Sequence, residues 1–98
     1  MRSISWSVEA IEDYHHTIDF ILSKWPSEVA MKFIAQTESI LSLIKDYPFL
    51  YPKTDYKHIR KAVINPHISL FYLVSEKEIV LIRFWNNHKD PNSLQIQT

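Results

Sequence analysis

The 98-residue sequence contains no cysteine and no glycine, and its formal charges cancel. Without cysteine, the chain has no disulfide framework and no thiolate chemistry, which fits a reducing compartment. Without glycine, it lacks the glycine-rich loop that cradles phosphates and the tight turn that presents a nucleophilic serine. Because eleven Lys and Arg residues balance eleven Asp and Glu residues, attraction to nucleic acid is not a property of the whole chain.

Long apolar runs are also missing. No segment approaches the roughly 18 apolar residues of a membrane span, and the first residues show no signal-peptide pattern. We therefore expect a cytoplasmic protein without a membrane partner. Hydrophobic residues nevertheless make up 46% of the sequence, including three Trp, five Tyr and five Phe, which predicts one folded domain over residues 1–98.

The first half of the sequence predicts a short strand followed by two helices. Residues 3–7 alternate between polar and apolar, as an edge strand does. Two segments with helical spacing follow and end before Pro26 and Pro48, with Ser7 and Ser27 as expected N-caps. The predicted core residues are Ile11, Tyr14, Ile18, Ile21, Leu22 and Trp25 in the first helix, and Ala30, Phe33, Ile34, Thr37, Leu41 and Ile44 in the second.

The last third predicts a three-stranded antiparallel meander. Residues 58–65, 67–74 and 78–85 are rich in β-branched and aromatic side chains, and NP and SEKE separate them as turns. Since glycine is absent, we expect Asn65 to take the positive-φ position of the first turn. The predicted fold class is α+β, with order β-α-α-β-β-β and an antiparallel helix hairpin on a small, mostly antiparallel sheet.

Arg83 interrupts the last apolar run, and two explanations are open. In the first, Arg83 pairs with Glu12 or Asp13, or extends past Trp85. In the second, its head group meets solvent or an anionic ligand. Strict alternation along the strand places Ile82 and Phe84 on one face, and Leu81, Arg83 and Trp85 on the other.

A basic concavity would form if Arg60 and Arg83 converged with the bases near residues 48–58. Lys53, Lys57, His58 and His88 are the further candidates, with Tyr51 or Tyr56 stacking a base. Such a site would suit RNA cleavage by 2′-hydroxyl attack, which needs a base, cations at phosphate and an acid. The alternatives are an exposed Arg60 and an aromatic cluster of Phe49, Tyr51 and Tyr56 that pins the loop.

Metal ligation is not indicated by any spacing of ligand residues. His15 and His16 are adjacent in a predicted helix, so their side chains point about 100° apart and cannot share an ion. We expect both on the surface, and no metal or other cofactor is implied.

The order of these elements resembles the RelE/ParE superfamily of bacterial type II toxins, and its ParE-like branch more closely. The resemblance implies a cognate antitoxin protein as partner, and DNA gyrase or messenger RNA on the ribosome as target. The segments that carry it are SISWS, AIEDYHHTIDFI, AMKFIAQTESILSLIKDYP, IRKAVI, ISLFYLV and EIVLIRFWNNHKDP.

Residue by residue, Arg60 and Arg83 match arginines of the family, and Lys53 or Lys57 matches lysines of its nucleases. Asn86 stands where many members have a histidine or tyrosine, and asparagine cannot transfer protons at neutral pH. His88 lies two residues further on. We therefore take Arg60, Arg83 and His88 as catalytic candidates, and as target-binding candidates Lys53, Lys57, His58, Trp85 and Asn86.

Three functions stay open at this point. A ParE-like toxin that binds gyrase without chemistry of its own is favoured, because of Asn86 and the zero net charge. A ribosome-dependent endoribonuclease is the alternative, so the sequence leaves open whether the protein is an enzyme. The third is an inactive member of the superfamily that only binds the antitoxin.

Overall fold

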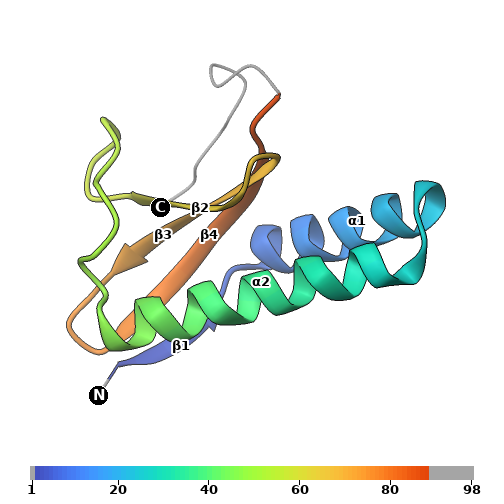
Figure 1. Cartoon of the computed structure of the whole chain (residues 1–98). Coiled ribbons are helices and arrows are strands. Elements are labelled where there is room, and N and C mark those ends of the chain that lie inside the picture. The colour runs from blue at the N-terminus through green and yellow to red at the C-terminus, as the bar shows by residue number, and fades with distance from the viewer. Residues whose placement is uncertain (1, 89–98) are drawn as a thin grey trace.

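Two antiparallel helices lie against one face of a four-stranded sheet in the computed structural model, which describes residues 2–88 (Figure 1). The strands lie in the order β1-β4-β3-β2; β1 runs parallel to β4, and the other neighbours are antiparallel. The predicted α+β fold class is therefore confirmed, with β3 and β4 as central strands. In chain order the elements are β1 (Ser3–Trp6), α1 (Val8–Lys24), α2 (Ser27–Asp46), β2 (Arg60–Asn65), β3 (Ile68–Val74) and β4 (Glu78–Asn86).

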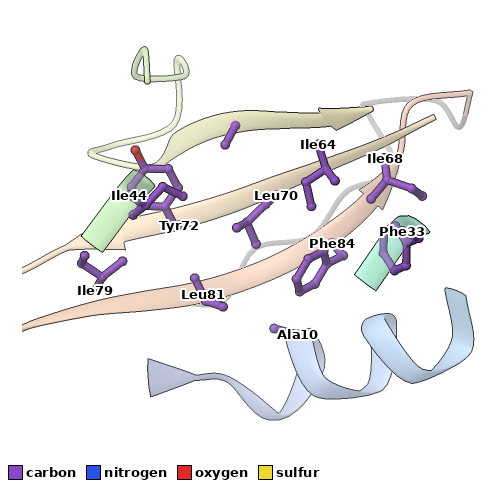
Figure 2. Close-up of a cluster of buried hydrophobic side chains, with 11 residues drawn as sticks. Ala10, Phe33, Ile44, Ile64, Ile68, Leu70, Tyr72, Ile79, Leu81 and Phe84 are labelled. Atoms are coloured by element: carbon purple, nitrogen blue, oxygen red, sulfur yellow. The ribbon is translucent and has the colours of Figure 1, made fainter. Parts of the chain in front are cut away.

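The main core lies between the helices and the sheet (Figure 2). Tyr14, Ile18 and Ile21 of α1 pack against it, as predicted. The predicted burial of Ile11, Leu22 and the C-cap residue Trp25 is wrong, because they are 42%, 50% and 49% exposed. The far end of the hairpin projects beyond the strands (Figure 1), which leaves Leu22 and Trp25 exposed, whereas Ile11 follows the buried Ala10 and lies off the stripe of α1 that meets the sheet. The buried residues of α2 are Ala30, Phe33, Thr37 and Ile44.

The two helices begin differently. Ser7 is the N-cap of α1: its hydroxyl accepts the N–H of Ala10 at 3.0 Å and donates to the Ile82 carbonyl of β4 at 2.8 Å. The expected cap at Ser27 is wrong. Pro26 is the N-cap of α2 and makes no side-chain cap bond, because the connection is so short that Ser27 already lies inside the helix.

The turn between β2 and β3 also differs from expectation. Asn65 does not adopt positive φ; within residues 2–88 the residue that does is Lys57, at 49°. Asn65 instead shapes the turn with its side chain, whose Oδ1 accepts the backbone N–H groups of His67 and Ile68 at 2.8 and 3.0 Å. A side-chain acceptor replaces the glycine that a tight turn would otherwise need.

Candidate functional site

Arg83 is held by a carboxylate from α1. Its Nε and Nη2 donate to the two oxygens of Asp13 at 2.7 and 3.0 Å, and the backbone N–H of Phe84 donates to the same carboxylate at 3.1 Å. The hydrogen bond from Asp13 raises the pKa of Arg83 above its ordinary value, although partial burial opposes the shift. The pairing of Arg83 with Asp13 was one of the two explanations of the sequence, and it is confirmed.

A β-bulge decides which way Arg83 points. Phe71 of β3 pairs with Arg83 and the next residue, Tyr72, pairs with Leu81, so Ile82 is the extra residue of β4. Leu81 and Phe84 consequently both face the helices (Figure 2). The alternation predicted for this strand is therefore wrong, because one inserted residue shifts every later side chain to the other face.

Arg60 is half-buried and stabilises the loop that precedes its strand. Its Nη1 donates to the carbonyls of Tyr51 and Phe49 at 2.7 and 3.3 Å. Its guanidinium lies 5.1 Å from the centre of the Phe49 ring, and that of Arg2 lies 5.3 Å from the same ring. The expectation of an exposed arginine is thus wrong: the loop carbonyls need donors, and Arg60 supplies them.

The two arginines do not converge. Arg60 pairs across strands with Tyr72, which belongs to the core beneath the helices. Arg83 pairs with Phe71, which belongs to the apolar cluster on the opposite face. Because side chains of paired residues share a face of the sheet, the side chains of Arg60 and Arg83 leave their strands on opposite faces, and the Arg83 guanidinium then meets Asp13 of α1.

The loop candidates Lys53, Lys57 and His58 are all exposed. Lys53 forms an isolated antiparallel bridge with Arg60, and the Nζ of Lys57 lies 5.4 Å from the centre of the Tyr56 ring. Internal bonds order the loop, among them the Thr54 N–H to the Ile59 carbonyl at 2.7 Å.

The predicted aromatic cluster of the loop does not form. Tyr51 packs against the main core, whereas Phe49 and Tyr56 are 57% and 44% exposed. Tyr51 is drawn to the core and Phe49 lies beside the guanidinium groups of Arg2 and Arg60, so the three rings do not pack on one another.

The end of β4 gathers the remaining candidates. The Arg83 guanidinium lies 5.8 Å from the centre of the half-buried Trp85 ring. Asn86 is exposed, and its Oδ1 accepts the backbone N–H of His88 at 2.8 Å. His88 Nε2 lies 2.9 Å from Nδ1 of His67. His67 is not among the residues predicted for the site, although the predicted meander brings the residue before its second strand beside the residues after its third.

Within residues 2–88, His15 and His16 are exposed as expected, and no three His, Cys, Asp or Glu residues gather as ligands of a metal ion. In the same part of the chain, neither helix is long and apolar enough to cross a membrane.

This architecture, with a helix hairpin on a mixed sheet, is that of the toxins of the RelE/ParE superfamily. The profile of the ParE toxin of the type II toxin–antitoxin system parDE matches residues 4–91. The chain belongs to this family and is the toxin component of a type II toxin–antitoxin system. No curated protein sequence matches the chain significantly.

Solved structures agree with the assignment at the level of the fold. The chromosomal ParDE system of P. aeruginosa contains a chain with 18% identity and a TM-score of 0.75, over 88% of this chain and 96% of that one. A YoeB/ParE toxin from Agrobacterium tumefaciens has 15% identity and a TM-score of 0.65, over 88% and 99%. The DinJ-YafQ complex of E. coli contains a chain with 15% identity and a TM-score of 0.60, over 88% and 93%.

Proposed function

We propose that this toxin stops growth by binding DNA gyrase in the cytoplasm, without cleaving RNA. The observation that supports the proposal is the placement of Arg60 and Arg83 on opposite faces of the sheet, each hydrogen-bonded within the molecule. Cleavage by 2′-hydroxyl attack needs cations that converge on one phosphate, together with groups that transfer protons. Among residues 2–88, Arg60 and Arg83 are not two cations that converge on one phosphate.

The zero net charge supports the same proposal. Proteins that act on RNA gain much of their affinity from basic side chains that neutralise phosphates. A toxin that binds a protein needs complementary shape and a few anchoring side chains instead. The exposed bases Lys53, Lys57 and His58, with Trp85 and Asn86, remain candidates for that contact.

A supercoiling assay tests the proposal directly. Purified full-length toxin is titrated into gyrase with relaxed plasmid, and we expect supercoiling to fall with dose and to recover when the cognate antitoxin is added. A gyrase that retains full activity at saturating toxin would contradict the proposal.

The alternative target class is tested in the same cells. After induction of the toxin, DNA synthesis and protein synthesis are measured in parallel, and we expect replication to stop first. His88→Gln separates the mechanisms further, because a nuclease that uses this imidazole would lose about 10²-fold or more in rate. Growth inhibition that persists in this variant supports gyrase binding, whereas an early stop of translation with cuts in messenger RNA supports the nuclease. Normal growth on induction would identify an inactive family member.

We also propose that the antitoxin covers the apolar tip of the helix hairpin, which consists of Phe20, Leu22, Trp25 and Val29. These four side chains are 39–54% exposed, and the rings of Phe20 and Trp25 meet edge to face at 5.9 Å. An exposed apolar patch of this kind is typical of a protein interface. We expect Trp25→Ser to weaken antitoxin binding by at least tenfold while the free toxin stays folded. Glu28→Ala at the same tip is the control, and equal affinity of both variants would contradict the assignment.

A further inference from the structure

Two histidines from distant parts of the sequence meet at one end of the sheet. His67 precedes β3 and His88 follows β4, and the pairing of Ile68 with Asn86 brings the two segments together. Nδ1 of His67 lies 2.9 Å from Nε2 of His88, across 21 residues of sequence. Both side chains are exposed, so ions in solution reach them.

The backbone around this pair is held by three asparagines. The N–H of His67 donates to Oδ1 of Asn65 at 2.8 Å, and the N–H of His88 donates to Oδ1 of Asn86 at 2.8 Å. The N–H of Asn87 donates to the carbonyl of His67 at 2.7 Å, which joins the two segments directly. Side chains on a frame fixed in this way lose little freedom when a ligand binds them.

We propose that His67 and His88 together bind one divalent transition-metal ion, of the class that prefers imidazole: copper, nickel or zinc. Two nitrogens bound to one such ion, each about 2.0–2.1 Å from it, lie roughly 2.9–3.4 Å apart in square-planar or tetrahedral geometry. The observed 2.9 Å falls at the short end of that range. The ring centres lie 5.1 Å apart, so the two nitrogens point at each other, and both exposed rings turn to aim their lone pairs at a shared ion. Water completes the coordination, because no third ligand residue joins the pair within residues 2–88.

The protons balance without a further reactant. In the metal-free pair, one neutral imidazole donates its proton to the other ring across the 2.9 Å contact. When the ion binds, the proton of His67 sits on Nε2 and that of His88 on Nδ1, so that both inner nitrogens offer a lone pair.

Copper(II) added below one equivalent to the untagged full-length chain tests the proposal by NMR. We expect the imidazole signals of His67 and His88 to broaden first, because the paramagnetic ion acts over short distances. His15 and His16, which cannot share an ion, serve as internal references. Equal broadening of the signals of all five histidines would overturn the proposal.

Calorimetry with copper(II) and zinc(II) measures the contribution of each ring. Both His67→Gln and His88→Gln should weaken binding at least tenfold, and His16→Gln should change it less than twofold. Circular dichroism confirms that the variants are folded, which the exposure of all three side chains favours. Affinity that survives in either single variant of the pair would overturn the proposal, as would equal binding of magnesium, a cation that prefers oxygen ligands. The result does not depend on which target the toxin binds.

Discussion

The carboxylate of Asp13 takes the place of a neighbouring strand at Phe84. β1 pairs with β4 only as far as Leu81, so the edge of β4 beyond that point would be open. There the Asp13 side chain accepts the N–H of Phe84 and, at the same time, both donors of Arg83. An unpaired backbone donor and a half-buried charge are thus satisfied by a single group.

Because Asp13 serves both groups, we expect its substitution to destabilise the protein more than substitution of Arg83. Asp13→Ala removes the carboxylate that Arg83 and the Phe84 N–H share, and we expect it to lower the free energy of unfolding by about 2–4 kcal/mol. Arg83→Ala leaves Asp13 bonded to the Phe84 N–H, and we expect a loss of about 1–2 kcal/mol. The two side chains are only 17% and 24% exposed, so solvent does not replace the pair fully.

Urea unfolding of the two variants and of the double variant measures these costs and the coupling between them. We expect a coupling of about 0.5–2 kcal/mol, as for residues in direct contact. Glu12→Ala, which removes the neighbouring exposed carboxylate of α1, is the control for a general charge effect. Equal losses for Asp13→Ala and Arg83→Ala would show that the bond to Phe84 contributes nothing.

The two serines near the helix starts provide a matched pair for a second prediction. Ser7→Ala removes a cap bond to Ala10 and a bond to Ile82, and we expect a loss of about 1–2 kcal/mol in unfolding free energy. Ser27→Ala lies inside α2 and replaces no cap, so we expect a change within about 0.5 kcal/mol. Thermal unfolding compares them, and a loss in Ser27→Ala as large as that in Ser7→Ala would contradict the assignment of the caps.

Tyr72 makes the stability depend on pH in the alkaline range. Burial raises the pKa of its phenol above the ordinary value of 10.0, although Arg60 opposes the shift. A raised pKa means that the folded state holds the proton more tightly than the unfolded state. The stabilisation is therefore complete below pH 10.0 and is lost as the pH rises towards the folded pKa.

The variant Tyr72→Phe isolates this contribution from other groups that titrate in alkali. Near neutral pH it should be less stable by about 1 kcal/mol, because the hydroxyl donates to the Pro48 carbonyl at 2.9 Å. Above pH 10.0 its melting temperature should fall less steeply than that of the parent. Parallel curves for the two proteins across this range would refute the role of Tyr72.

The sequence predicts the elements well and their details less well. Periodicity and proline positions define both helices, because the hydrophobic effect requires an apolar stripe wherever a helix meets the sheet. The width of that stripe depends on how far the helix reaches across the sheet, so Ile11, Leu22 and Trp25 could not be placed from spacing alone. The bulge at Ile82 could not be predicted either. In a strand that is apolar on both faces, an inserted residue does not change the hydrophobic pattern.

The candidate site, too, could be predicted from the sequence only in part. Arg83 stood out because a charge in a central strand needs a partner, and its pairing with Asp13 follows from that rule. Whether the side chains of Arg60 and Arg83 converge depends on the register of the strands and on the bulge in β4. The sequence reveals neither of these. His67 was missed because its relation to His88 arises only from the register of β3 against β4.

Arg60 provides the prediction that best separates a structural from a target-binding arginine. Arg60→Ala removes the donor of the Tyr51 and Phe49 carbonyls, and we expect a loss of about 1–2 kcal/mol in unfolding free energy. Arg60→Lys should recover only part of this, because an ammonium group lacks the planar fork of donors. The amide of Thr54 donates to the Ile59 carbonyl, and the amide of Lys61 donates to the Pro52 carbonyl of the loop. Hydrogen exchange at both amides should become faster in both variants.

Lys61→Ala is the matched control for Arg60, since it removes an exposed cation next to it in β2. We expect this variant to exchange and unfold like the parent. If Arg60 acts through the loop, growth inhibition by Arg60→Ala should fall only as far as the loop opens, and Arg60→Lys should restore growth inhibition and slow exchange in part and to the same extent. Complete loss of toxicity in Arg60→Lys with unchanged exchange would instead show that the guanidinium itself contacts the target.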